Sequence, residues 1–154
     1  MWLTRNYAAT VNGLVDGWRA PYGFHAHLTE HGWWKFDMPP GWRRYVDAPI
    51  MEKAWFQWVA ANEHIRDHIQ NRPCLRVKFG EFRRHPRQVL HRICRFAGIA
   101  EPADASLPPT MVTEPPRPGR WRDRAEQILP YSTRERTRSL MVGMGYTMEQ
   151  DTWD

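Results

Sequence analysis

The sequence predicts an α/β fold in which a small parallel sheet is flanked by helices. Two short segments have the pattern of strands. Residues 1–3 (MWL) are apolar, and Leu75, Val77 and Phe79 alternate with polar residues, which is the period of a strand with one buried face. Each segment is followed by a helical pattern of apolar residues, and strands that alternate with helices are typical of parallel sheets.

The second strand leads into a polar loop, expected over residues 80–85, and then into a helix. Pro86 suits the first helical position because its missing N–H would be unpaired there in any case, and Gly98 is placed to end the helix in a left-handed conformation. Ligands of open α/β sheets bind beyond the carboxyl ends of strands, so this loop is the first place to expect a site. The apolar face of the helix consists of Val89, Leu90, Ile93, Cys94 and Ala97.

The composition is that of one globular domain with a basic balance. The chain has 154 residues, of which 42% are hydrophobic and 25% charged, and 22 Lys and Arg against 17 Asp and Glu give a net charge of +5. The only lysines are Lys35, Lys53 and Lys78. Such a surplus of Arg favours bidentate binding of phosphate, sulfate or carboxylate, or else reflects a solvated surface.

Both cysteines, Cys74 and Cys94, lie in apolar patterns and are expected to be buried free thiols of a reducing compartment. No segment approaches the roughly 18 apolar residues of a membrane span. Arg5 and Asn6 interrupt any apolar core of a signal peptide. We therefore expect a cytoplasmic protein without a membrane span.

The first helix is expected over residues 7–18, and a loop over residues 21–46 follows it, with a rigid turn at Pro39–Trp42. One face of the helix carries Ala8, Val11, Leu14, Val15 and Trp18. The loop contains His25, His27 and His31. These histidines are candidate metal ligands or bases, but no fourth ligand stands at a zinc-like spacing, so surface histidines without a role are the alternative.

The strongest helical period lies in residues 47–71, which predicts a core helix. Asp47 or Ala48 is expected to cap it, with Pro49 near its first position. Asn62 shares the apolar stripe, so its amide must hold a neighbouring loop or face a ligand. The apolar stripe consists of Met51, Ala54, Trp55, Trp58, Val59, Ile65 and Ile69. On this helix a solvated face is favoured over a metal site for the pair His64 and His68.

A Pro-rich segment, residues 99–124, contains a cluster with the composition of an anion site. Guanidinium groups, a glycine that lets backbone N–H groups approach, and an aromatic plane occur together there. The alternative is a disordered segment. The cluster consists of Arg117, Gly119, Arg120, Trp121 and Arg122.

The C-terminal part, residues 125–146, is expected to hold the terminal helices. A short helix over residues 121–129 should end at Pro130, and Ser132 with Glu135 has the pattern of a capping box for the last helix. The acidic tail beyond that helix is expected to fray. The apolar residues of the last helix are Leu140, Met141 and Met144.

Four segments follow one another in an order found in a known family. They are LTRNYAATVNGL, the run from PPGWR to APIMEKAWFQWVAAN, VKFGEFRRHPRQVLHRICRFAGI, and GRWR with the later MGY. Their order resembles the sulfotransferase family, bacterial type, whose members use 3′-phosphoadenosine 5′-phosphosulfate. The resemblance implies part of a P-loop-like three-layer fold, with residues 1–20 as a strand–helix unit that binds the 3′-phosphate, 21–46 as the acceptor-side loop, 74–98 as a strand–loop–helix unit, and 99–124 as a loop over the nucleotide.

The resemblance also implies a set of nucleotide-binding residues. Arg5 would bind the 3′-phosphate, and Gly13 stands where the family has a Ser that helps to hold it. Phe79 stands where the family has a Tyr near adenine, so it would stack without the hydroxyl. The residues implied to close over the 3′-phosphate are Arg120, Trp121 and Arg122.

One part of the family pattern is missing from the sequence. The Ser/Gly/Thr-rich loop that cradles the 5′-phosphosulfate has no counterpart, and no Gly-rich phosphate motif is visible. The chain is therefore similar to the C-terminal portion of a sulfotransferase without its N-terminal strands. A fragment, a split enzyme whose second chain supplies the rest, and a decayed remnant are the three interpretations.

The implied activity is transfer of a sulfuryl group from 3′-phosphoadenosine 5′-phosphosulfate to a hydroxyl or amine acceptor, with little or no transfer expected from the isolated chain. The alternative is a non-catalytic module that binds adenosine 3′,5′-bisphosphate or a similar anion. A basic nucleic-acid-binding domain is the least favoured function, because the arginines are dispersed along the sequence and no known motif of that kind appears.

Overall fold

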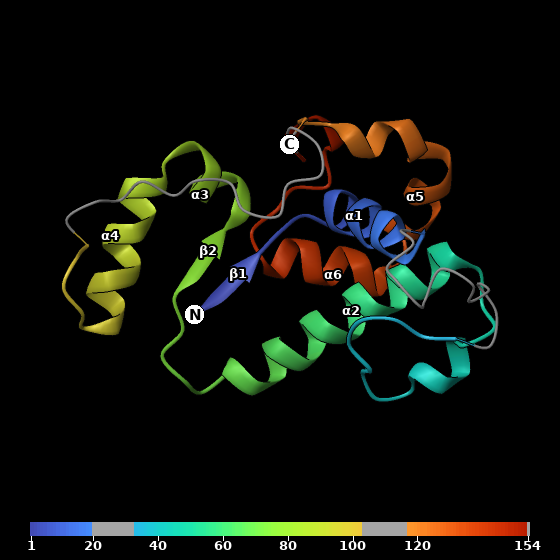
Figure 1. Cartoon of the computed structure of the whole chain (residues 1–154), viewed down its shortest axis with the longest axis horizontal. Helices are drawn as coiled ribbons and strands as arrows, with labels where there is room; N and C mark the ends of the chain where they lie inside the picture. Colours follow the sequence, from blue (N-terminus) through green and yellow to red (C-terminus); the bar gives the residue numbers. More distant parts are fainter. Residues whose placement is uncertain (20–32, 103–116, 154) are drawn as a thin grey trace.

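The computed structural model describes residues 1–19, 33–102 and 117–153. The predicted roles of His25, His27 and His31, and those of most of the Pro-rich segment, fall outside these ranges. The elements in chain order are β1 (Trp2–Thr4), α1 (Tyr7–Arg19), the 3-10 helix η2 (Trp42–Tyr45), α2 (Ile50–Ile69), β2 (Arg76–Lys78), α3 (Phe79–Arg84), α4 (Pro86–Ala97), η3 (Arg120–Arg124), α5 (Ala125–Ser132), α6 (Glu135–Gly143) and η4 (Gln150–Thr152) (Figure 1).

The two strands form a parallel sheet, as the sequence predicts. The register aligns Thr4 at the end of β1 with Lys78 at the end of β2. At the other end, the N–H of Trp2 donates to the carbonyl of Leu75 at 2.8 Å. Helices make up most of the remaining described chain, so the α/β expectation holds in its coarse form. Because the strands are parallel and in register, the residues that follow them emerge side by side.

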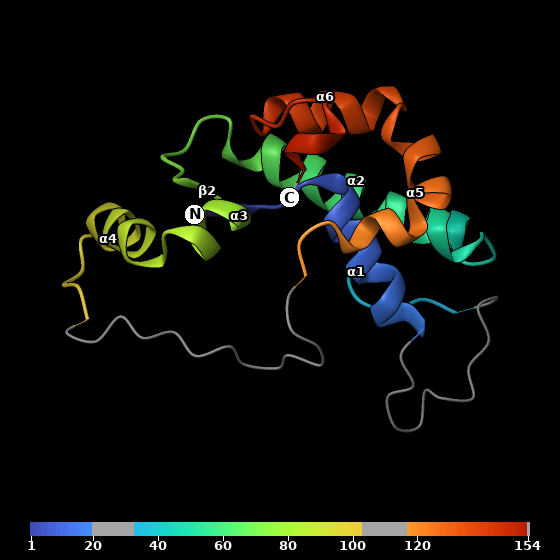
Figure 2. The ribbon, with the colours of Figure 1, turned by 90° about the horizontal axis from the view of Figure 1, so that it is seen from above.

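The main core is built by α1, α2, α5 and α6, the helical body, and it is rich in tryptophan (Figure 2). Tyr7 of α1 meets Trp58 of α2 edge to face, with ring centroids 5.3 Å apart. The indole N–H of Trp55 donates to Thr137 Oγ1 of α6 at 2.9 Å. Aromatic rings of this size bury about 150–250 Å² each, so a small number of them is enough to hold the four helices together. The buried tryptophans are Trp2, Trp18, Trp34, Trp55, Trp58, Trp121 and Trp153.

The first helix and the turn before α2 agree with the sequence prediction. α1 ends one residue later than expected, at Arg19. Its first turn is capped by Asn6, whose Oδ1 accepts the N–H of Ala9 at 2.8 Å. The predicted rigid turn is present, since the N–H of Trp42 donates to the carbonyl of Pro39 at 3.0 Å. Gly41 has a φ of 87°, a conformation that glycine adopts without strain.

α2 begins differently from the prediction. Pro49 is the N-cap residue rather than the first helical residue, and no side chain caps the helix, so the expected cap at Asp47 or Ala48 is wrong. The carbonyl of Pro49 accepts the N–H groups of Glu52 at 2.9 Å and Lys53 at 3.1 Å. Pro49 has a ψ of 146°, and this extended conformation places the first helical dihedrals at the next residue.

The apolar stripe of α2 is buried only in the first half of the helix. Beyond Val59 no residue of the helix is fully buried: Ile65 is 36% exposed, and Ile69 packs against the core while only partly buried. Asn62 Nδ2 donates to the carbonyl of Trp58 at 2.7 Å. Its amide nitrogen therefore bonds within its own helix and not to a neighbouring loop, so the expectation that it holds such a loop is wrong.

Most of the polar loop predicted over residues 80–85 belongs instead to the short helix α3, so that prediction is wrong. Gly80 does not have a positive φ and continues the helix instead of breaking the chain into a loop. Only His85 separates α3 from α4. The ends of α4 agree with the prediction: the helix starts at Pro86 and stops at Gly98, which has a φ of 68°.

A second, small group of buried side chains lies under α4. Val77, Val89 and Cys94 are buried, yet none of them belongs to the main core. We infer that α4 covers Val77 on the face of the sheet opposite Trp2. Both cysteines are free, as predicted, although Cys74 is only partly buried. Figure 2 shows α3 and α4 together at one end of the molecule, beside the helical body.

The helices near the C-terminus depart from the prediction at two residues. Pro130 lies inside α5 instead of ending it, because the burial of Ile128 outweighs the one backbone hydrogen bond that a proline removes. Ser132 is the last residue of α5, and its hydroxyl donates to the carbonyl of Leu129 at 2.7 Å. The predicted capping box is therefore wrong, and Arg134 is the N-cap of α6.

The tail beyond α6 is packed, so the expectation that it frays is wrong. Trp153 is 1% exposed. Its indole N–H donates to the carbonyl of Thr147 at 2.9 Å. Its own carbonyl accepts from Asn6 Nδ2, the side chain that also caps α1. A tryptophan close to the end of the chain is the feature that the acidic composition of the tail concealed.

Candidate anion-binding site

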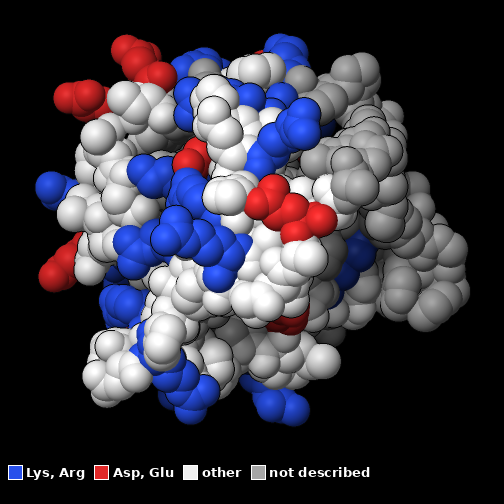
Figure 3. Space-filling view, turned by 90° about the vertical axis from the view of Figure 1, so that its left-hand side faces the viewer, with Lys and Arg blue, Asp and Glu red and all other residues white. Residues whose placement is uncertain are grey.

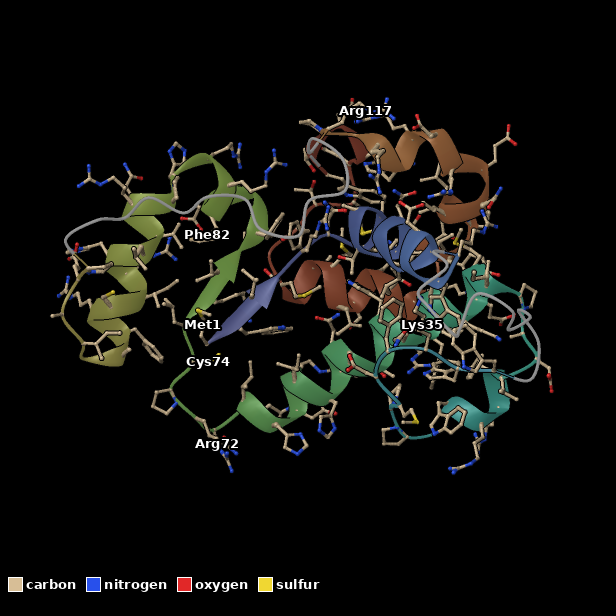
Figure 4. The ribbon with its side chains drawn as sticks, viewed as in Figure 1. Met1, Lys35, Arg72, Cys74, Phe82 and Arg117 are labelled. Carbon is tan, nitrogen blue, oxygen red and sulfur yellow. The ribbon has the colours of Figure 1, made fainter. Side chains whose placement is uncertain are left out.

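The candidate site lies where the two strands end. Arg5 comes directly after the last residues of β1, and Phe79 comes directly after β2. Because Thr4 and Lys78 are paired in register, these two residues lie side by side. The guanidinium carbon of Arg5 is 5.0 Å from the centroid of the Phe79 ring, within the range of a cation–π contact. Figure 4 shows Phe82 of α3 at this end of the strands, and Met1 and Cys74 at the opposite end.

The turn after α6 forms hydrogen bonds with the last residues of both strands and so holds the two strand ends of the site in place. The Tyr146 hydroxyl donates to the carbonyl of Thr4 at 3.1 Å. Lys78 Nζ donates to the carbonyl of Gly145. Gly145 has a φ of 79°, which permits this tight turn. The MGY sequence thus holds the two strand ends together, although it lies more than sixty residues beyond β2.

Two further arginines act on Arg5. The pKa of Arg5 is lowered from its ordinary value, first by partial desolvation of the guanidinium and then by the positive charges of Arg83 and Arg120. Arg83 is one helical turn beyond Phe79 on α3, so both side chains lie on the same face. The described residues offer Arg5 no hydrogen bond or ion pair. Arg5, Arg83 and Arg120 with the ring of Phe79 are named the arginine cluster below.

Arg120 reaches the arginine cluster from the 3-10 helix η3 and is anchored there by α1. Gly119, with a φ of 72°, turns the chain into η3. The carboxylate of Asp16 on α1 forms ion pairs with Arg120 and, at 2.6 Å, with Arg124. Arg124 also donates to Asn12 Oδ1 at 2.6 Å. Asp16 therefore positions Arg120 and neutralises part of its charge.

The remaining predicted site residues lie at different depths. Gly13 is exposed on α1, one turn before Asp16, and a Cβ added to it would meet no atom within 4 Å. Trp121 is buried in the main core, 5.5 Å from the ring of Trp153, and its indole N–H has no hydrogen-bond partner in the described structure. Arg122 lies over the outer face of Trp121, with its guanidinium carbon 4.9 Å from the ring centroid.

Of the predicted site residues, the structure brings Arg5 and Phe79 into contact and places Arg120 where its charge acts on Arg5, and sequence reasoning missed Arg83 and Asp16. The signal for Arg83 was its spacing of four residues from Phe79, which has meaning only in a helix, and a loop was expected there. No sequence signal links Asp16 to Arg120, because they are far apart in the chain. Arg117, also predicted near the anion site, forms an ion pair with Asp123 in its own turn.

The described residues contain no group of three His, Cys, Asp or Glu side chains that could hold a metal ion. The rings of His64 and His68 are tilted with centroids 4.0 Å apart, and His68 Nδ1 lies 2.8 Å from the carbonyl of His64. Both residues are exposed, so the predicted solvated face is confirmed. In the same parts of the chain, no helix is at once long enough and apolar enough to cross a membrane.

The chemistry of the arginine cluster is that of anion recognition. Guanidinium groups bind phosphate and sulfate through paired N–H donors, and the exposed side of an aromatic ring accepts a flat base by stacking. Bringing three like charges together is unfavourable, and a bound dianion would relieve that repulsion. Comparisons with known protein families, curated proteins and solved structures found no match for this chain.

Proposed function

We propose that the arginine cluster binds the adenosine 3′,5′-bisphosphate part of 3′-phosphoadenosine 5′-phosphosulfate, and that the chain is a sulfotransferase-type protein with part of a P-loop-like fold. The observation that supports this proposal most is the contact of Arg5 with Phe79 at the carboxyl ends of paired parallel strands. Open α/β sheets bind their ligands at that place.

In this proposal each residue of the arginine cluster has a distinct role. Arg5 and Arg120 hold the 3′-phosphate, and Phe79 stacks on adenine. Arg83, which the resemblance does not include, adds a third positive charge to the same phosphate. The bound nucleotide supplies the sulfuryl group that is transferred to a hydroxyl or amine acceptor. The protein contributes position and charge stabilisation, the two main sources of catalysis in such transfers.

A non-catalytic nucleotide-binding module is the second candidate function. Two observations favour it. The arginine cluster contains three cations and a phenyl ring, none of which is a general base at neutral pH. The sequence also has no Gly-rich loop for the 5′-phosphosulfate. Incubation with donor labelled in the sulfuryl group and a panel of hydroxyl and amine acceptors distinguishes the two, because only an enzyme releases adenosine 3′,5′-bisphosphate together with a labelled product.

Calorimetric titration with adenosine 3′,5′-bisphosphate tests the binding site itself. Arg5→Ala should raise the Kd about tenfold to a hundredfold, since charge-assisted hydrogen bonds contribute about 1.5–3 kcal/mol. Arg138→Ala is the matched control. Arg138 is exposed on α6, so this substitution removes the same charge at a position outside the arginine cluster. Absence of binding by the wild-type chain at millimolar nucleotide, or equal Kd values for the two variants, would refute the proposed site.

A further inference from the structure

The net charge of the protein is concentrated in one segment. Residues 76–101, the basic segment below, contain seven of the 22 Lys and Arg and two of the 17 Asp and Glu. This segment therefore carries a charge of +5, equal to the net charge of the whole chain, and the remaining residues are neutral together. It comprises β2, α3 and α4. The arginines are therefore not dispersed here, and residues 117–138 contain a second group of seven Arg against three Asp and Glu.

The structure places the basic segment at one end of the molecule. α3 and α4 stand apart from the helical body in two perpendicular views (Figures 1 and 2). The face of the molecule on that side shows Lys and Arg gathered in a band with few acidic groups between them (Figure 3). A cationic surface that is joined to a neutral body is accessible to a partner much larger than a nucleotide.

α4 divides its residues sharply between two sides. Val89 and Cys94 face inward and are buried. The opposite side of the helix, from the same spacing rules, carries mainly polar residues. These exposed residues are Arg87, Gln88, His91, Arg92 and Arg95. Arg87 lies at one edge of this side, and Phe96, which is 45% exposed, lies at the other.

The acidic groups of the basic segment do not cancel its charge. Glu81 is paired with Arg92, and Glu101 with His91. The side chains of Arg83, Arg87 and Arg95 have no hydrogen bond or ion pair with any residue that the structure describes. Arg87 and Arg95 are eight residues apart, or about 12 Å along the helix axis. Among the described residues, these two charges therefore have no acidic partner, and both lie on one solvent-facing ridge.

We propose that the outward side of α4 binds the phosphodiester backbone of a nucleic acid duplex. The segment contains six Arg and one Lys, and Arg forms paired donor contacts to phosphate. The major groove of B-DNA is about 12 Å wide and admits one α-helix, and α4 is a helix with twelve residues that projects from the body. An anionic membrane is the less suitable partner, because the exposed apolar side chains of this region, Phe96 (45%) and Ile99 (61%), lie away from the row of Arg87, His91 and Arg95 that the duplex would contact.

The test measures fluorescence anisotropy of a labelled 20-base-pair duplex of random sequence at several salt concentrations. The wild-type chain should bind with a steep salt dependence. Arg87→Ala combined with Arg95→Ala should weaken binding and reduce the slope of log K against log salt by about two, because each lost phosphate contact contributes roughly 0.9. Arg44→Ala combined with Arg138→Ala removes the same charge from exposed positions outside the basic segment and should change the slope little.

Two controls and three contrary outcomes complete the test. Circular dichroism must show equal helix content for both double variants, since all four residues are exposed. The Arg5→Ala variant should bind the duplex as tightly as the wild type. A loss of duplex affinity in this variant would assign the binding to the arginine cluster and overturn the proposal. Absence of duplex binding at low salt, equal slopes for the two double variants, or binding to phosphatidylserine vesicles without binding to the duplex would each overturn it as well.

Discussion

The helical body and the basic segment are stabilised by different means. The main core, around which the helical body is built, contains seven tryptophans together with Tyr7, Val11, Val15 and Val59. The basic segment buries only Val77, Val89 and Cys94, and it carries the entire net charge of the chain. A region with little buried apolar surface opens more readily than a well-packed core. The site proposed for the nucleotide lies on the boundary between the two, with Arg5 and Arg120 supplied by one side and Phe79 and Arg83 by the other.

This division shows that the arginine cluster depends on two regions of unequal stability. The hydrogen bond from the Tyr146 hydroxyl to the carbonyl of Thr4 ties the turn after α6 to the end of β1, directly before Arg5. Phe79 and Arg83 move with α3, whose own contacts are mainly with β2 and α4. We therefore expect substitutions in the helical body to unfold the whole chain and substitutions under α4 to affect the site locally.

The largest effect is expected for Trp58→Ala in the helical body. Trp58 is 3% exposed and packs against Tyr7, so its removal leaves a large cavity and should cost about 3–5 kcal/mol of unfolding free energy. Urea denaturation followed by both circular dichroism and tryptophan fluorescence measures the loss. If Trp58→Ala lowers the unfolding free energy by less than Val89→Ala does, the comparison between the two regions is wrong.

Val89→Ala should have a smaller and more local effect. Val89 lies on the inner side of α4, and its side chain is fully buried. Loss of two methyl groups should cost about 2 kcal/mol, from roughly 0.8 kcal/mol for each buried group plus the cavity. Hydrogen exchange followed by mass spectrometry should show faster exchange in residues 86–97 and unchanged exchange in α2. Equal acceleration in both helices would mean that the basic segment and the body unfold as one unit.

High pH should destabilise the helical body, because burial raises the pKa of Tyr7 well above its ordinary value of 10.0. The unfolded chain loses this proton above pH 10 while the folded chain keeps it, so the unfolding free energy should fall as the pH rises. The expected slope from Tyr7 is about 1.4 kcal/mol per pH unit above pH 10. Urea titrations at pH 8, 10 and 11 measure it.

Tyr7→Phe is the control for that pH dependence. The Tyr7 hydroxyl makes only a long hydrogen bond of 3.4 Å to the carbonyl of Ile128, so the variant should lose little stability at pH 8. Its stability should decline less steeply than that of the wild type above pH 10, with the remaining slope due to Tyr131 and Tyr146, whose pKa values burial also raises. Parallel curves for variant and wild type would show that Tyr7 ionises in the folded state.

The smallest effect, a gain, is expected for Gly13→Ala. Gly13 is helical and exposed, and a new Cβ would meet no atom within 4 Å. Replacing Gly by Ala in a helix stabilises it by about 0.5–1 kcal/mol. Thermal denaturation should therefore show a higher Tm. Gly13→Ser should gain less stability, and if the proposed nucleotide site is right it should also lower the Kd for adenosine 3′,5′-bisphosphate.

Local patterns predicted most of the secondary structure. The two strands, α1, the limits of α4 and the free cysteines follow from periodicity and from Pro86 and Gly98 at the ends of α4. Errors arose where tertiary contacts decided the outcome. Pro130 is kept within α5 by the packing of Ile128, and Ser132 bonds back into α5 instead of capping α6.

The site was predictable to the extent that it sits at strand ends. The parallel pairing brings Arg5 to Phe79, and this pairing follows from two short apolar patterns. Arg83 depends on α3 being helical, and the role of Asp16 depends on contacts between α1 and η3. The first dependence is local, because the spacing of Phe79 and Arg83 has meaning once α3 is read as a helix. The second is not visible in a local sequence window, because it results from how distant segments pack.

The order of assembly follows from the contacts that link the first strand and helix to the last helix. Met141 Sδ accepts the N–H of Tyr7 at 3.2 Å, the hydroxyl of Tyr146 reaches Thr4, and the carbonyl of Trp153 accepts from Asn6. A ribosome makes residues 2–7 first and residues 141–153 only after everything between them. The core of the helical body therefore closes only after synthesis has passed Trp153, and until then the tryptophans of α2 lack part of the surface that covers them.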